Sequence, residues 1–351
     1  MPRVRTNRAG DKLLFHLMFS DIYAAQKAAR ENTVTEERES SMTVARKGKL
    51  QRLTTAITEI RCAEPEGDDI AFLLPTLCHV AMPRSRQTKR VFERHSGSAS
   101  LRLEAGALWD GERWIDQPLP YGTKPRLLLL HIVRSYLRTQ DRSDRMIDLG
   151  KSAKDFLENT LGINASGGRN GGLTGFREQM NAFAACHMLL GYGAPDGSAK
   201  TQRAAPIVEE FEAWPSPAGG SGQKHLWPRG LQISEKFAAS IAESSVPLDM
   251  RAIRALQNSA LSLDQYSWLA HRLWRLKRPQ NLYWANLRQQ FGEEISDPKN
   301  FRRNFLSSMQ SVLEVYPQAK VSIFQGGIQL KPSQPPVPKK AVVIPFELKT
   351  A

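Results

Sequence analysis

Residues 263–330 read LDQYSWLAHRLWRLKRPQNLYWANLRQQFGEEISDPKNFRRNFLSSMQSVLEVYPQAKVSIFQGGIQL, and their apolar side chains recur at helical spacing in three successive runs. The first run, Leu263–Leu276, ends before Pro279, and the second run, Asn281–Phe291, stops at Gly292. Proline lacks a backbone donor and glycine tolerates the left-handed conformation, so both residues often end a helix. We expect a helix over each of these two runs.

The third run predicts the longest of the three helices. Asp297 can cap it, Pro298 suits its first position, and we expect it to continue to Val315, before Pro317. The following stretch, KVSIFQGGIQL, has two short alternating runs around paired glycines, which predicts a β-hairpin. Helix, helix, turn, helix and hairpin is the element order of a winged helix. We therefore predict a winged-helix domain over residues 231–335.

The same order of elements occurs earlier in the chain. The segments Lys124–Thr139, Ser152–Leu161 and Thr174–His187 predict three helices, with the glycine-rich turn SGGRNGG before the third. The runs MLLGYG and IVEEFEAW then predict a hairpin around the turn-rich stretch APDGSAK. We therefore predict a first winged-helix domain over residues 106–214.

The remaining segments complete the predicted organisation. Residues 215–230, PSPAGGSGQKHLWPRG, are rich in glycine and proline and predict a linker between the two domains. Residues 1–105 predict a basic arm and a helical region, and residues 336–351 predict a tail. The expected fold class is α+β, mostly helical, with two winged-helix domains in tandem after a helical N-terminal region.

The charge of the chain indicates a polyanionic partner. The 351 residues carry a formal net charge of +14. Residues 248–351 hold 15 Lys and Arg against 7 Asp and Glu, which makes this part the main basic region. Since the last helix of a helix-turn-helix unit lies in the major groove, we expect double-stranded DNA as the partner.

The third helix of the second domain has a polar face opposite an apolar one. Phe301, Phe305, Met309, Val312 and Tyr316 share one side, which we expect to be core. Arginine, asparagine and glutamine on the other side match the edges of guanine and adenine. An ordinary solvated helix face is the alternative interpretation. The DNA contacts expected on this side are Lys299, Asn300, Arg302, Arg303, Ser307 and Gln310.

The hairpin after this helix adds two candidate contacts, Lys320 and Lys331, which we expect to neutralise phosphates. Aromatic side chains lie among arginines in the same domain, an arrangement that could also stack on bases. Their helical spacing favours core packing instead, and they are Trp268, Trp274, Tyr283 and Trp284.

The third helix of the first domain has a less basic outer face. We expect His187 to lie in its buried stripe with Phe176, Met180 and Phe183. Glu178 lies on the outer face, which could read bases weakly, contact phosphates or bind protein. The candidate contacts in this helix and the turn before it are Arg169, Asn170, Thr174, Arg177 and Asn181.

No catalytic or cofactor site can be assigned from the sequence. Gly150-Lys151-Ser152 resembles the end of a phosphate-binding loop, but Arg145 stands where that motif requires glycine. The three cysteines are scattered, and no histidine has a metal-ligand partner at helical spacing. No apolar run approaches the roughly 18 residues of a membrane helix. We expect a cytoplasmic protein that is not an enzyme, with no cofactor, metal or membrane partner.

Several stretches resemble the RepA-type plasmid replication initiators. They are LPYGTKPRLLLLHIVRSYLRTQ, IDLGKSAKDFLENTLGINASGGRNGGLTGFREQM, SLDQYSWLAHRLWRL, LRQQFG, NFRRNFLSSMQSVLEVYP and LKPSQPPV, and the resemblance spans residues 70–338. The segment AMPRS departs from the family pattern, in which Pro-His would follow the apolar run.

This resemblance implies a protein that initiates replication at repeated sites in a plasmid origin. It also implies a host initiator and the replicative helicase as partners, a homodimer, and plasmid copy control through repression of the protein's own promoter. Two alternative functions remain open. One is a winged-helix transcriptional repressor, and the other is a winged-helix protein-interaction scaffold.

Overall fold

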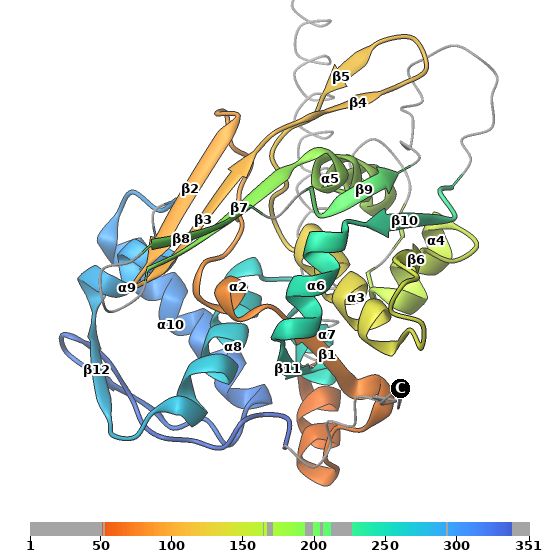
Figure 1. The fold of residues 1–351 in the computed structure, drawn as a ribbon. Helices are drawn as coiled ribbons and strands as arrows, with labels where there is room; N and C mark the ends of the chain where they lie inside the picture. Colours follow the sequence, from red (N-terminus) through yellow and green to blue (C-terminus); the bar gives the residue numbers. More distant parts are fainter. Residues whose placement is uncertain are drawn as a thin grey trace, which may run out of the picture. The chain divides into compact units, whose positions relative to one another are not determined.

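The computed structural model describes residues 51, 53–163, 165–166, 171–193, 199–203, 206–211, 227–292 and 294–338. The described residues from Thr55 to the end of the described chain belong to one compact unit. The fold is mixed α and β, as expected (Figure 1). Among the described residues, no helix is both long and apolar enough to cross a membrane.

Residues 260–330, here called the C-terminal group, combine three helices with a three-stranded antiparallel sheet. The sheet has the order β12-β14-β13. The elements are α8 (Ala260–Arg272), η3 (Leu273–Arg275), β12 (Gln280–Tyr283), α9 (Trp284–Phe291), α10 (Pro298–Val315), β13 (Val321–Phe324) and β14 (Gly327–Leu330).

Helix α10 forms as its sequence predicts. The Asp297 side chain accepts hydrogen bonds from the backbone N–H groups of Lys299 (3.1 Å) and Asn300 (3.2 Å), and Pro298 occupies the first turn. These contacts satisfy donors that the start of a helix leaves free. The predicted apolar face is confirmed as core, since its buried side chains are Phe301, Phe305, Met309, Val312, Val315 and Tyr316.

The second helix of the C-terminal group is shorter than expected. Residues 280–283 form β12, which pairs with β14, so α9 begins only at Trp284. The expected core role of the aromatic residues holds for Trp268, which is fully buried, and fails for Trp274 and Tyr283, which are 42% and 56% exposed. A helical pattern gave the wrong orientation for Tyr283 because that residue ends a strand.

Residues 124–233, here called the N-terminal group, contain a second small antiparallel sheet, with the order β6-β10-β9. Helix α4 continues into a π-helical turn, η2. The elements around this sheet are α3 (Lys124–Arg138), β6 (Met146–Asp148), α4 (Ala153–Asp155), η2 (Phe156–Thr160), α5 (Gly172–Ala185), β9 (Val208–Phe211) and β10 (Gly230–Ile233).

The segment predicted as a linker, residues 215–230, lies between β9 and β10. These two strands pair antiparallel, with Leu231 opposite Phe211. The described strands before and after the segment thus belong to one sheet, and its residues 215–226 lie outside the described residues.

The predicted hairpin between MLLGYG and IVEEFEAW is wrong. MLLGYG lies in β7 (His187–Gly193), which pairs with β3 (Ala99–Glu104) and β8 (Ala199–Arg203) in a four-stranded sheet of order β2-β3-β7-β8. Leu103 lies opposite Met188 and Leu101 opposite Leu190, and all four side chains are buried. Strand β7 therefore pairs with the distant β3 and with the nearby β8, whereas the run IVEEF contains β9, which pairs with β10.

His187 is exposed, which corrects its expected place in the buried stripe of the third helix. The helix, α5, ends at Ala185, and His187 is the first residue of β7. The predicted stripe is correct for Phe176, Met180 and Phe183, which are all buried.

The helical region expected over residues 1–105 contains strands in its described part. Strand β1 (Ile70–Leu73) is buried and pairs with β11 (Val246–Asp249). Strands β2 and β3 alternate buried and exposed side chains along most of their length. The remaining elements are η1 (Gly67–Asp69), α2 (Pro75–His79), β2 (Val91–Ser96), β4 (Ala107–Trp109), β5 (Trp114–Asp116), α6 (Glu235–Glu243) and α7 (Met250–Leu256).

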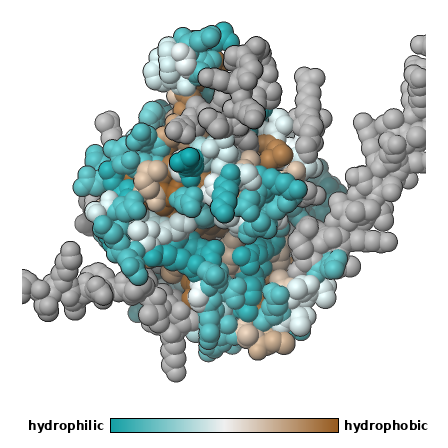
Figure 2. All heavy atoms as spheres, turned by 90° about the vertical axis from the view of Figure 1, so that its right-hand side faces the viewer, coloured by the Kyte–Doolittle hydropathy of each residue, from teal (hydrophilic) through white to brown (hydrophobic). Residues whose placement is uncertain are grey.

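The hydrophobic residues are mostly inside. Figure 2 shows a face that is largely hydrophilic, with small separate hydrophobic areas. The β4–β5 hairpin projects from the body in Figure 1 and carries the exposed Trp109 and Trp114, whose rings lie 5.6 Å apart.

Candidate nucleic-acid interface

The outer face of α10 is fully accessible. All six residues expected there to contact DNA are exposed: Lys299, Asn300, Arg302, Arg303, Ser307 and Gln310. No Asp or Glu occurs from Pro298 to Leu313, so the first four turns present only positive and neutral polar groups. Such a face can approach a polyanion without electrostatic repulsion.

Trp284 connects α10 with the turn of the hairpin β13–β14. Its backbone N–H donates to Gly326 O (3.0 Å), and its indole Nε1–H donates to Gln325 O (3.1 Å). The Arg302 guanidinium lies over the Trp284 ring, 5.0 Å from the centroid, in a cation–π contact. One aromatic side chain thus fixes the hairpin turn next to the second turn of α10.

The two hairpin lysines, Lys320 and Lys331, lie at the end of the hairpin opposite its turn. Lys331 N–H donates to Lys320 O at 3.0 Å, and both side chains are exposed. The turn itself consists of Gln325 and Gly326, and Gly327 is the first residue of β14. The lysines can neutralise phosphates from this position, but they do not lie beside the first turns of α10.

Two further basic residues, Lys277 and Arg278, were missed from the sequence. They precede β12, whose first residue, Gln280, pairs with Leu330 at the end of β14. Both are exposed, and the strand register places them at the same end of the sheet as Lys320 and Lys331. The basic run LKR after η3 was the available signal, and a helix expected to extend to Leu276 obscured it.

The α5 face of the N-terminal group is much less accessible than that of α10. Thr174, Arg177 and Asn181 are each half-buried, and burial lowers the pKa of Arg177. The neighbouring Gln179 is buried and accepts a hydrogen bond from Tyr121 N–H at 2.7 Å. A nearby chain segment therefore covers part of the helix that was expected to contact DNA.

The turn before α5 contains the two other candidates, Arg169 and Asn170, and both lie outside the described residues. The structure brings together the candidates of α10, and it does not place those of α5 on a comparable open face. In the part of the chain that the structure describes, no group of three or more His, Cys, Asp or Glu side chains could hold a metal ion.

Comparison with known proteins supports the resemblance found in the sequence. Residues 119–286 match the family model described as plasmid encoded RepA protein. The match runs from the segment before α3 into α9, so α10 and its hairpin lie beyond it. The expected relationship to the RepA-type plasmid proteins is confirmed over this part of the chain.

Among solved structures, the crystal structure of domains 2–3 of RctB is similar to this chain. The alignment covers 73% of this chain and 94% of that one, with 11% sequence identity and a TM-score of 0.41. A likeness at this level carries no argument about function. No curated protein sequence matches the chain significantly.

Proposed function

We propose that this chain, which matches the plasmid RepA family over residues 119–286, is a plasmid replication initiator that binds duplex DNA at the origin. The observation that carries the DNA-binding part is the exposed, acid-free face of α10 with its two adjacent arginines. Arginine and amide side chains at the start of such a helix can reach base edges in the major groove. In this proposal the protein acts by binding and catalyses no step.

The order of elements supports assigning a winged helix to each group. Along the chain, the C-terminal group has the order helix, strand, helix, helix, strand, strand. In its sheet the third strand lies between the first and the second. The N-terminal group has the same succession, α3, β6, α4, α5, β9 and β10, and its sheet β6-β10-β9 has the same order. The pair β7–β8 is inserted before the last two strands of that group.

The two groups differ in what they offer to DNA. The C-terminal group combines an open α10 face with four exposed basic residues at one end of its sheet. The half-buried residues of α5 favour a lesser DNA role for the N-terminal group. In this proposal, base reading therefore belongs mainly to α10, and phosphate contacts belong to Lys277, Arg278, Lys320 and Lys331.

DNA footprinting on the parent replicon tests the proposed function. An initiator protects repeated sites within the origin, and origin-dependent replication fails when those sites are removed. Protection of a promoter alone would support the alternative of a transcriptional repressor. Absence of protection anywhere would support a protein-interaction scaffold. Recruitment of host replication proteins and homodimer formation belong to the same proposal and need separate binding measurements.

A further inference from the structure

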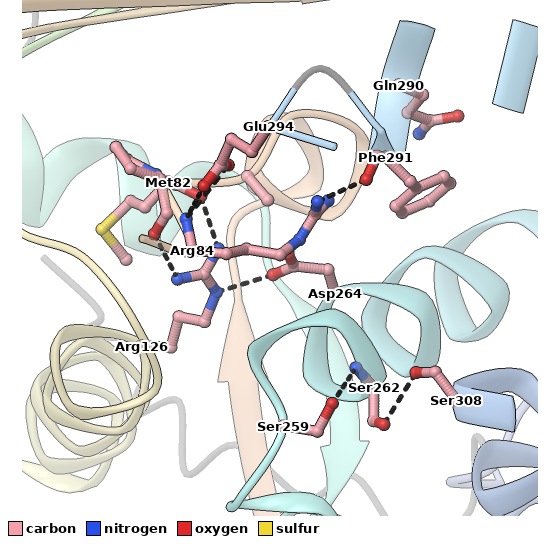
Figure 3. Close-up of polar contacts among 12 residues, drawn as sticks. Met82, Arg84, Arg126, Ser259, Ser262, Asp264, Gln290, Phe291, Glu294 and Ser308 are labelled. Carbon is pink, nitrogen blue, oxygen red and sulfur yellow. Dashed lines mark hydrogen bonds and ion pairs between the residues drawn. The ribbon is translucent and has the colours of Figure 1, made fainter. Parts of the chain in front are cut away.

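Five charged side chains meet between the N-terminal half of the compact unit and the C-terminal group, and we call them the arginine joint. Arg84 follows α2, Arg94 lies on β2, and Arg126 lies in the first turn of α3. Asp264 lies on α8 and Glu294 in the turn between α9 and α10. Figure 3 shows Arg84, Arg126, Asp264 and Glu294 converging from these separate elements.

Asp264 is the centre of the first half of the joint. It accepts hydrogen bonds from Arg126 Nε (2.7 Å) and Nη2 (3.1 Å), and from Arg84 Nε (3.0 Å). Asp264 is 9% exposed and Arg126 6% exposed. The other Arg126 donors bind the carbonyl oxygens of Met82, Pro83 and Gly122. The carboxylate therefore ties α8 to α3 and to the segment before β2.

Arg84 contacts α8, the end of α9 and the turn before α10. Its Nε–H binds Asp264 on α8, and its Nη1–H binds the carbonyl oxygen of Phe291, the last residue of α9. Its backbone N–H donates to both Glu294 oxygens, at 3.1 and 3.0 Å, in the turn before α10. A single residue from outside the C-terminal group thus contacts α8, α9 and the turn that leads into α10.

Glu294 is the centre of the second half of the joint. It also accepts hydrogen bonds from Ser85 N–H (2.8 Å), Ser85 Oγ–H (2.7 Å) and Arg94 Nη2 (2.8 Å). Arg94 is fully buried and also donates to Ala81 O at 3.0 Å. Because Glu294 lies three residues before Asp297, the N-cap of α10, these bonds fix where α10 begins.

A joint of this kind restricts orientation more than an apolar contact does. Apolar surfaces can slide without losing burial, whereas each buried guanidinium–carboxylate contact has a narrow range of distance and angle. Removing one partner leaves a buried charge without compensation. A complete joint therefore restricts how the C-terminal group can move relative to the elements that carry Arg84, Arg94 and Arg126.

We propose that Arg84 and Glu294 are positioning residues that hold the start of α10 in a fixed place relative to the segment after α2 and, through the contact of Asp264 with both Arg84 and Arg126, relative to the N-terminal group. The consequence for DNA rests on the proposed function: the two groups contact the duplex at two sites that are a fixed distance apart. The positioning itself can be measured in the free protein without DNA.

The first measurement is a distance distribution between two spin labels in the full chain. The labels replace the exposed Ala239 on α6, which packs on α3, and the exposed Gln318 just after α10. A Cys62→Ser background removes the exposed native thiol, while Cys78 and Cys186 are buried. We expect a narrow distribution with the joint intact and a broader or displaced one in Arg84→Lys and in Glu294→Gln.

The matched control is Glu112→Gln, which removes the same charge from an exposed position in the β4–β5 turn and should leave the distribution narrow. Circular dichroism verifies that each variant is folded. Folded Arg84→Lys and Glu294→Gln proteins with the unchanged, narrow distribution would overturn the proposal.

The second measurement uses origin duplexes with a half-turn, about 5 base pairs, inserted between the two protected segments. We expect the insertion to weaken binding of the original protein by about tenfold or more, and that of Glu294→Gln by much less. Equal losses in both proteins would contradict the fixed separation. If the original protein does not bind the origin at all, the proposed function fails, and the label distances still decide whether the joint positions α10.

Discussion

At the scale of single residues, the two adjacent arginines of α10 are in different situations. Arg302 lies over the Trp284 ring and is held there by a cation–π contact. Arg303 is exposed and, among the described residues, has no hydrogen-bond or ion-pair partner. A guanidinium without an internal hydrogen bond or ion pair keeps its donors for a base edge or a phosphate. Arg303 is therefore the residue in which base reading is best tested.

Replacing Arg303→Ala should weaken binding to the origin site by about 1–3 kcal/mol and relax discrimination at one base position. The physical reason is the loss of two parallel donors to one guanine. Titration of the variant on origin and scrambled duplexes measures both effects, with circular dichroism as the folding control.

The companion variant is Lys320→Ala, since Lys320 lies at the end of the hairpin away from its turn. It should weaken binding to both duplexes alike, as expected for a phosphate contact. If Arg303→Ala also lost affinity equally on both duplexes, Arg303 would be a phosphate contact. If it lost none, the wrong face of α10 would have been assigned to DNA.

At the scale of elements, the sequence predicted the features that depend on residues close together in the chain, such as helix caps and turns. The Asp297 cap, Pro298 and the apolar spacing of α10 were all visible in the sequence, and so were the two glycines between which β14 begins. Pairing between distant strands was not predictable in this way. The alternation of Leu101 and Leu103 is clear only once β7 is known to lie beside β3. Likewise the residues of β12 were predicted to be helical, because their partner strand lies far along the chain. Tyr283, the last residue of β12, pairs with Gly327 of β14, 44 residues later.

Replacing Gly327→Ala should destabilise the protein by about 1–3 kcal/mol, as overpacking usually does. A Cβ there would lie 1.9 Å from the backbone oxygen of Leu282, so β12 and β14 could not approach as they do. Urea unfolding measures the change through the transition midpoint. Gly193→Ala in β7 is the matched control, because its Cβ would have 3.9 Å to its nearest neighbour, Ser98 O. Equal stability of the two variants would show that the hairpin adjusts without cost.

At the scale of the whole molecule, the candidate DNA face was predictable and the joint behind it was not. The residues of α10 share one helix, so their common face follows from helical spacing. Arg84 and Asp264 are 180 positions apart, and Arg84 and Glu294 are 210 apart. No spacing rule connects such residues. The apolar context of AMPRS gave no sign that its arginine would be buried against the C-terminal group.

The proposed phosphate contacts predict how salt affects binding by the full chain. Each neutralised phosphate contributes about −0.9 to the slope of log K against log salt concentration. The double variant Lys320→Ala with Lys331→Ala should therefore have a slope smaller in magnitude by about 1.8. Lys236→Ala, on the exposed side of α6, is the control and should keep the original slope. A double variant with the original slope would place both lysines away from DNA.

The pH dependence of stability should reflect two histidines that lie between α2 and α8. The rings of His79 and His271 are 4.7 Å apart. Burial, with the nearby charges of Arg272 and Arg275, lowers the pKa of His79 from 6.5 to about 4. Burial, with the charges of Arg275, His79 and Arg272, lowers the pKa of His271 from 6.5 to about 3.

Both rings therefore stay neutral in the folded protein at pH 5, whereas the unfolded chain binds a proton at each. Stability rises with pH wherever the unfolded state binds more protons, so it should be complete above pH 6.5 and decrease as the pH falls towards 4. Thermal unfolding at pH 7.5 and pH 5 measures this decrease. His79→Phe keeps an aromatic ring against His271 but removes one titrating group, so its melting temperature should fall less between the two pH values. A variant whose melting temperature falls as much as that of the original protein would show that carboxylates, and not these histidines, cause the loss of stability in acid.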